Sequence, residues 1–169
     1  MQIIIKNTQD IEFMRISCKL AAEVLDYIEP YVQPGITTLE LDKLCHDYIV
    51  DVQQAYPSPL NYKPSSKGPA FPNSICTSIN SEICHGIPNE KALKDGDIIN
   101  LDITVYKNGY HGDTSRTFLV GNKVSPQAKR LVQITYEAMW LGIQQVKPGN
   151  YLGDIGHAIQ QYVESERFG

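Results

Sequence analysis

Two aspartates, Asp102 and Asp113, flank an Asn108-Gly109 dipeptide near the middle of the chain. The segments on either side, 97–105 and 110–120, are rich in β-branched and apolar residues. Asn-Gly between two such segments is the strongest short-range signal for a β-hairpin. The sequence therefore predicts a two-stranded antiparallel ribbon with one carboxylate on each strand.

A two-residue turn at this dipeptide pairs Asp102 with Ser115 and Asp113 with Thr104, and it places all four side chains on one face. The two carboxylates are then diagonal neighbours, about 7–8 Å apart at the backbone. Like charges at this separation repel each other unless a cation lies between them. Because hard divalent ions prefer oxygen ligands and one carboxylate can bridge two ions, the pair indicates a metal site.

The alternative is a solvated face whose acids pair with Arg116 or Lys107. The parity of Arg116 puts it on the opposite face of the ribbon, and Lys107 lies at the turn. A bulge near Gly112 would shift the parity and remove the argument for a shared face. Spacing alone leaves both interpretations open.

Composition indicates one globular domain with a substantial core, since the 169 residues are 42% hydrophobic and carry a formal net charge of −4. No basic footprint for nucleic acid is present. Segment 1–6 is too short an apolar run for a signal sequence or a membrane span. The four cysteines show no C-x-x-C spacing, so we expect reduced thiols in a cytoplasmic protein that binds neither nucleic acid nor membranes.

Hydrophobic periodicity predicts two helices in the first third of the chain. The first spans 10–32 and is followed by a turn at 33–35. Thr37 or Thr38 is the expected N-cap of the second helix, whose apolar face continues to Val52.

The rest of the chain is predicted to alternate between loop, strand and helix. The proline-rich segment 55–72 is expected to be loop. Strands are predicted at 74–79 and 82–85, before the hairpin, and the helical period returns after Pro126.

An internal repeat is indicated by the turn sequence V-x-P-G, which occurs at 32–35 and again 114 residues later at 146–149. Helical patterns flank both copies, which predicts two related halves. The first half is expected at about 10–124, and the second begins at 125–169 without its strands. Chance similarity between two helix-turn-helix segments is the alternative.

His85 lies in the sequence Cys84-His85-Gly86-Ile87-Pro88, at a predicted strand end where a turn begins. Such positions often direct a side chain into a cleft, where an imidazole beside a metal site could exchange a proton with a substrate. A surface histidine is the alternative. His111 lies near the hairpin turn and is expected at the rim of the ribbon, while His46 and His157 lie on helices without an expected chemical role.

Five stretches of the chain resemble the methionine aminopeptidases of the short bacterial type. They are FPNSICTSIN (71–80), ICHGIP (83–88), LKDGDIINLDIT (93–104), YHGDTS (110–115) and VKPG (146–149). The resemblance spans almost the whole chain. It implies the α+β "pita-bread" fold, two αβ halves related by a pseudo-two-fold axis, with the first half complete and the second truncated.

The resemblance also implies a site. The family binds two divalent ions, Co, Mn, Fe or Zn, through five residues, of which Asp102 matches a chelating ligand and Asp113 the bridging ligand. His85 matches the residue that binds the substrate around the scissile amide. The positions that match the walls of the methionine pocket are Tyr62, Phe71 and Cys76.

The implied activity is metal-dependent removal of the initiator methionine from new polypeptides whose second residue is small. The partners would be nascent chains, with ribosome association left open, and we expect a monomer for the full-length protein. A prolidase or aminopeptidase P type of peptidase is one alternative. A non-catalytic binding module that has only the half-fold is the other.

Two departures from the family pattern stand out. The family continues past the point that matches Gly169, and that portion carries a histidine and two glutamate ligands. We therefore expect a fragment that is inactive alone, because two carboxylates do not complete the metal site. The second departure is an apparent insertion at 64–69, beside the expected pocket.

Overall fold

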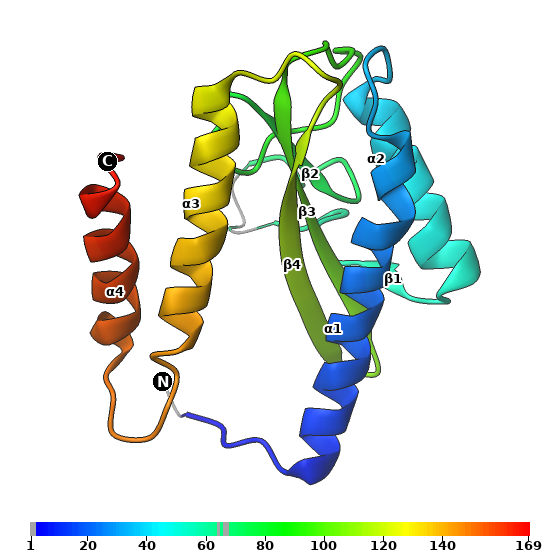
Figure 1. The fold of residues 1–169 in the computed structure, drawn as a ribbon. Helices are drawn as coiled ribbons and strands as arrows, with labels where there is room; N and C mark the ends of the chain where they lie inside the picture. Colours follow the sequence, from blue (N-terminus) through cyan, green and yellow to red (C-terminus); the bar gives the residue numbers. More distant parts are fainter. Residues whose placement is uncertain (1–2, 64, 66–67) are drawn as a thin grey trace. The chain divides into compact units, whose positions relative to one another are not determined.

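A computed structural model describes residues 3–63, 65 and 68–169, and the chain divides into two compact units, residues 1–123 and 124–169. The helices of the first unit are α1 (Thr8–Ile28), the 3-10 helix η1 (Glu29–Tyr31), α2 (Thr38–Asp47) and the π-helical η2 (Tyr48–Val52) (Figure 1). Its strands are β1 (Tyr56–Pro57), β2 (Cys76–Ile79), β3 (Ile98–Lys107) and β4 (Tyr110–Leu119). The second unit contains α3 (Pro126–Ile143) and α4 (Leu152–Ser165).

Helix α1 begins two residues before the predicted start because Asn7 caps it. The Asn7 side chain accepts a hydrogen bond from the backbone N–H of Asp10 at 2.9 Å, and the Asp10 carboxylate accepts from the N–H of Asn7 at 2.8 Å. This reciprocal pair is a capping box. The predicted end at Val32 is wrong: the α-helix ends at Ile28 and continues only as η1, since Pro30 lacks an N–H for a further α-helical bond.

Helix α2 begins where the sequence indicated, with Thr37 as the N-cap. The Thr37 hydroxyl accepts from the N–H of Glu40 at 3.1 Å, and the Glu40 carboxylate accepts from the N–H of Thr37 at 2.8 Å. The helical path reaches Val52 as predicted, with its last turn widened to the π form in η2.

The sheet is built around β3. Strand β4 pairs antiparallel with β3 along its whole length, while β1 and β2 pair antiparallel with separate parts of its other edge. The short strand β1 corrects the prediction that 55–72 is entirely loop. It is compatible with Pro57, since proline is tolerated at the edge of a sheet.

The β3–β4 hairpin has the predicted register. Lys107 pairs with Tyr110 across the turn, where Asn108 has φ 54° and Gly109 has φ 88°, as a type I′ turn requires. Val105 pairs with Gly112 in unbroken sequence, so the ladder contains no bulge there.

The strand predicted at 82–85 is not formed. After β2 the chain turns back on itself, because the Glu82 carboxylate accepts from the N–H of Ile79 at 2.9 Å and the N–H of Glu82 donates to the Ile79 carbonyl at 3.1 Å. His85 then adopts φ 56°, which is incompatible with a strand. Local hydrogen bonding therefore favours a turn where the sequence predicted a strand.

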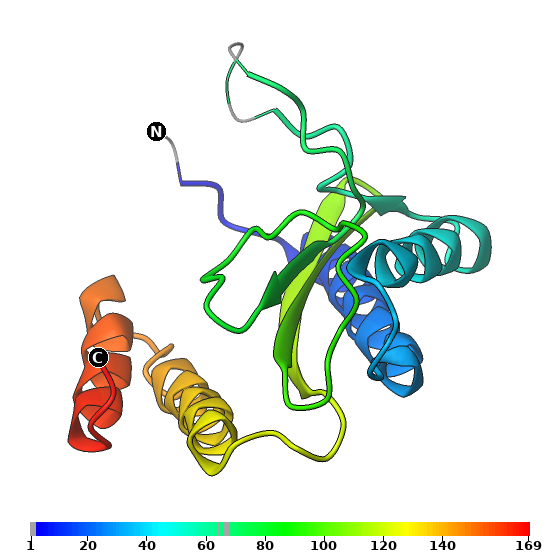
Figure 2. The same ribbon diagram turned by 90° about the horizontal axis from the view of Figure 1, so that it is seen from above.

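The two faces of the sheet differ in character. Four alternate β3 side chains are fully buried in the core: Ile99, Leu101, Ile103 and Val105. Helices α1 and α2 cover this face (Figures 1 and 2). At Gly112 a Cβ would lie 2.1 Å from the Ser17 carbonyl oxygen, so the close approach of β4 to α1 requires glycine. The opposite face is free to carry polar residues.

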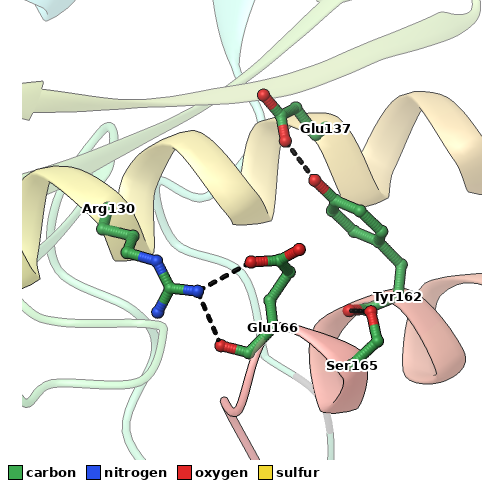
Figure 3. Close-up of polar contacts among 5 residues, drawn as sticks. All are labelled: Arg130, Glu137, Tyr162, Ser165 and Glu166. Atoms are coloured by element: carbon green, nitrogen blue, oxygen red, sulfur yellow. Dashed lines mark hydrogen bonds and ion pairs between the residues drawn. The ribbon is translucent and has the colours of Figure 1, made fainter.

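The second unit is a helical hairpin with a polar network on one side. Arg130 of α3 donates to both the carboxylate and the backbone carbonyl of Glu166, at 2.7 and 2.9 Å (Figure 3). The Tyr162 hydroxyl of α4 donates to the Glu137 carboxylate of α3. These contacts join the two helices.

The apolar side of this hairpin is largely exposed. Helix α3 has three buried residues, Ile134, Ala138 and Gly142, and α4 has none. The two helices form an apolar groove whose lining includes Met139, Ile143 and Ile159.

The internal repeat expected from the two V-x-P-G turns stays a prediction. Within the described part of the chain, no helix is long and apolar enough to cross a membrane.

Candidate metal centre and its pocket

The two aspartates lie on the polar face of the sheet, at the predicted positions. Asp102 of β3 pairs with Ser115, and Asp113 of β4 pairs with Thr104, so the carboxylates are diagonal neighbours. Burial raises the pKa of Asp102, as do the charge of Asp113 and a hydrogen bond between the two carboxyls, while His85 opposes the shift. Ionising Asp102 beside Asp113 is therefore costly in the absence of a cation.

The two basic residues considered as partners for these acids are engaged elsewhere. Arg116 lies on the opposite face and donates to Asp26 and Glu29, at 2.8 and 3.1 Å. The Lys107 ammonium donates to two backbone carbonyls after η2, at 2.5 and 2.7 Å. Neither side chain neutralises the carboxylate pair.

The donor set fits part of a site for hard divalent ions. Both side chains provide carboxylate oxygens. A cation bound between them would relieve the electrostatic repulsion between the two negative charges. Among the described residues, no cluster of three or more His, Cys, Asp or Glu side chains could hold an ion. Within this part of the chain, the pair offers two carboxylate groups to a divalent ion.

A cavity of about 710 Å³ lies over this face. Its lining is Ser58, Pro59, Tyr62, Pro69, Phe71, Cys76, His85, Ile87, Asp102, Thr104, His111 and Asp113. The cavity thus brings together every residue for which the sequence predicted a role in catalysis, metal binding or substrate binding. It is large enough for a small-molecule or peptide side-chain site.

His85 is placed in the cavity by the turn that follows β2. The N–H of Thr77 donates to the Gly86 carbonyl at 2.9 Å, and the N–H of Gly86 donates to the Ser78 hydroxyl at 3.2 Å. A Cβ at Gly86 would lie 2.0 Å from the Thr77 carbonyl oxygen, so this contact requires glycine. The segment after β2 is held against the strand, and the exposed His85 imidazole lines the cavity.

The predicted pocket residues Tyr62 and Phe71 are held together by the backbone. The N–H of Phe71 donates to the Tyr62 carbonyl at 2.9 Å, and the N–H of Asn61 donates to the Phe71 carbonyl at the same distance. Of the segment 64–69, residues 64, 66 and 67 lie outside the described residues, while Pro69 lines the cavity. An aromatic wall therefore stands at one side of the cavity.

Cys76 completes this group from β2, where it pairs directly with Asp102. Burial raises the pKa of the Cys76 thiol to about 11, with a further contribution from the nearby aspartates. At neutral pH the thiol therefore stays protonated, which suits a small wall residue better than a soft metal ligand.

The other cysteines and histidines have varied surroundings. Cys84 and His157 are exposed, and the His46 imidazole lies 2.7 Å from the Ser74 hydroxyl. His111, expected at the rim of the ribbon, instead lines the cavity and lies 2.8 Å from the Ser58 hydroxyl.

Sequence reasoning missed the contribution of Ser58, Pro59 and Ile87 to the cavity. Ser58 follows a two-residue strand that no periodicity reveals, so no local pattern places it near β4. For His111 a signal existed, since its parity matches that of Asp113. Because His111 lies near the turn, it was expected at the rim of the ribbon. Its contact with Ser58 could not be predicted from local sequence.

Comparison with known proteins relates almost the whole chain to one family. The model of metallopeptidase family M24 matches residues 12–169. The methionine aminopeptidase of Escherichia coli (strain K12) is 52% identical over 169 residues, covering 99% of this chain and 61% of that protein. The chain thus spans about three fifths of the length of this curated relative.

Comparison with solved structures gives the same family relationship. The structure of methionine aminopeptidase from Rickettsia prowazekii superimposes with a TM-score of 0.91 and 52% identity, covering 98% of this chain and 63% of that one. The Xaa-Pro dipeptidase from Bacillus anthracis gives a TM-score of 0.79 at 22% identity, over 96% of this chain and 42% of that one. At this lower identity the similarity shows the fold alone. The expected pita-bread fold is therefore confirmed.

Proposed function

This chain belongs to metallopeptidase family M24, and we propose that the protein it represents removes the initiator methionine from new polypeptides whose second residue is small. The observation that carries the proposal is one cavity that joins a paired-carboxylate centre, an imidazole and an aromatic wall. The 52% identity to a methionine aminopeptidase supports this specificity over that of a prolidase, for which the similarity is confined to the fold.

The metal would be held in part by Asp102 and Asp113, and we propose two ions, as in the family that the chain resembles. Divalent ions, when bound, polarise the scissile carbonyl and stabilise the negative charge that develops on its oxygen. Co, Mn, Fe or Zn would suit oxygen and imidazole ligands according to availability.

His85 binds the substrate at the scissile amide. Its imidazole lines the cavity near Asp102, whose pKa it influences, so it lies within reach of a peptide held at the metal centre. A hydrogen bond from this ring orients the amide for attack and stabilises the departing nitrogen.

The methionine side chain of the substrate packs against Tyr62, Phe71 and Cys76. A thioether is unbranched and polarisable, and it packs favourably against the edges of aromatic rings. We place the reaction in the cytoplasm, where nascent chains are the substrates, with the full-length enzyme acting as a monomer. Contact with the ribosome is compatible with this role.

The test uses the full-length protein, a Met-Ala-Ser peptide and added Mn(II) or Co(II). We expect metal-dependent release of methionine, and we expect Asp113→Asn to abolish it while the fold is retained. The matched control is Asp47→Asn, which removes a carboxylate from an exposed pair with Lys43 and should leave activity unchanged. Retained turnover in Asp113→Asn, or cleavage of X-Pro peptides in preference to Met-Ala-Ser, would contradict the proposal.

A further inference from the structure

A hydrogen bond crosses the polar face of the sheet at one end of the cavity. The Ser58 hydroxyl and His111 Nδ1 lie 2.8 Å apart. Ser58 directly follows β1, on one edge of β3, whereas His111 belongs to β4, on the other edge. The bond therefore spans β3 and ties together two segments that do not pair through their backbones.

Ser58 begins the short segment that ends at Tyr62, one of the two residues of the aromatic wall. We refer to residues 58–62 as the wall turn. The N–H of Ser58 donates to the Thr104 carbonyl of β3 at 2.9 Å, and the N–H of Tyr62 donates to the Pro59 carbonyl at 3.0 Å. Ser58 and Tyr62 therefore begin and end one hydrogen-bonded turn, and the backbone pairing of Tyr62 joins this turn to Phe71.

On the other side, His111 is joined to the strand that carries Asp113. The two residues are separated by one position and share a face, so their Cα atoms lie about 6–7 Å apart. The His111 ring also packs against the Tyr106 ring, with centroids 4.8 Å apart. This packing restricts the imidazole and leaves Nδ1 directed at Ser58.

We propose that the Ser58–His111 hydrogen bond sets the position of the wall turn relative to the carboxylate pair and thereby sets selectivity for the methionine side chain. Ser58 and His111 are positioning residues that act through Tyr62. The inference rests on the proposed function, because the selectivity it concerns is that of a methionine aminopeptidase.

The test compares kcat and KM of the full-length enzyme for Met-Ala-Ser and Leu-Ala-Ser. Ser58→Ala and His111→Phe remove the bond, whereas Ser58→Thr keeps a hydroxyl and His111→Asn keeps a polar group near the position of Nδ1. We expect the first two variants to raise KM for the methionine peptide about three- to tenfold and to lower the preference for methionine over leucine by a similar factor. The kcat should change by no more than about twofold.

Two further comparisons isolate the bond. The double variant Ser58→Ala/His111→Phe should be no worse than either single variant, because both remove one shared interaction. Ser58→Thr and His111→Asn should behave as the wild type. Ser165→Ala removes an exposed hydroxyl from α4, which contributes no lining residue to this cavity, and serves as the control.

An unchanged preference in Ser58→Ala would overturn the inference, as would a loss confined to kcat, which would indicate disturbed metal ligation. A readout that needs no activity is hydrogen exchange at the Phe71 amide, which donates to Tyr62. We expect exchange to rise about three- to tenfold in Ser58→Ala and to stay unchanged in Ser58→Thr. An unchanged rate of exchange at the Phe71 amide in Ser58→Ala would refute the proposed role of the Ser58–His111 hydrogen bond. Inactivity of the wild-type enzyme on methionine peptides would instead refute the proposed function.

Discussion

At the scale of single residues, the pair Asp102 and Asp113 is a feature that disfavours the folded state, because two neighbouring carboxylates repel each other. Two carboxyls within hydrogen-bonding reach, one of them half-buried, are retained without a cationic side chain between them. Folded proteins keep such local conflict mainly at functional sites, where a ligand resolves it.

One consequence is that Asp102→Asn should stabilise the metal-free protein at neutral pH. Because the folded-state pKa of Asp102 is raised above its ordinary value of 3.8, the protonated form stabilises the fold below pH 3.8, and this stability is lost as the pH rises through the raised pKa. The variant keeps a neutral group at all pH values. Asp102 is half-buried and Asp113 is exposed, so solvent screens their repulsion, and we expect a gain of about 2–4 °C in Tm at pH 7.

Thermal unfolding in EDTA measures this difference, which should vanish near pH 3. Asp47→Asn, at an exposed ion pair, should show no such gain. Added Mn(II) should stabilise the wild type and leave Asp102→Asn nearly unchanged. A lower Tm for metal-free Asp102→Asn at pH 7 would rule out repulsion between the carboxyls.

His85 provides a second prediction at this scale. His85→Ala should lower kcat by about 10²-fold, because a group that orients the scissile amide acts mainly in the transition state. Metal affinity, measured by calorimetric titration with Mn(II), should change much less. His157→Ala, at an exposed position of α4, is the control, and an equal loss in activity and metal affinity would contradict the role proposed for His85.

At the scale of elements, the contact between α1 and β4 positions the carboxylate strand. Gly112 lies between His111 and Asp113, and its backbone approaches Ser17 too closely for any Cβ. The packing of α1 against Gly112 therefore fixes the distance between α1 and the part of β4 that carries His111 and Asp113. We therefore expect activity at the proposed centre to depend on a contact made on the opposite face of the sheet.

Gly112→Ala should destabilise the protein by about 1–3 kcal/mol, because the clash involves backbone atoms that cannot rotate away. Metal-dependent activity should fall as well, since Asp113 moves with the strand. Urea denaturation measures the first effect. Gly153→Ala, where a Cβ meets open space in α4, should be neutral or stabilising by up to about 1 kcal/mol. Equal free energies of unfolding for the two variants would show that α1 can move away from β4 without loss of stability.

At the scale of the whole molecule, the two units differ in how much core they contain. The first unit buries a continuous cluster between α1, α2 and the sheet. In the second, α3 and α4 leave an apolar groove uncovered, with Met139 and Ile143 each more than 40% exposed. Exposed apolar surface of this kind promotes association.

We therefore expect the 169-residue polypeptide to self-associate at micromolar concentration and to bind the dye ANS. Sedimentation velocity should show a shift towards monomer in the variant Met139→Lys/Ile143→Lys. Leu152→Lys, which alters an exposed residue outside the groove lining, should not produce this shift. A monomeric wild-type polypeptide with cooperative unfolding would instead support an independent module.

Much of the fold follows from local sequence. The Asn108-Gly109 turn and the alternation of polar and apolar residues along β3 and β4 determine the hairpin, its register and the shared face of Asp102 and Asp113. The capping residue Thr37 determines the start of α2. These predictions succeeded because each depends on neighbours within a few positions of the chain.

Other features depend on contacts that no local pattern contains. The strand expected at 82–85 is replaced by a turn because Glu82 bonds back to Ile79, and strand β1 exists only because β3 has a free edge beside it. The sequence by itself thus determined the family resemblance and the paired carboxylates. Only the tertiary structure decided that Ser58 meets His111 above β3, since residues 53 positions apart are brought together by the packing of the sheet as a whole.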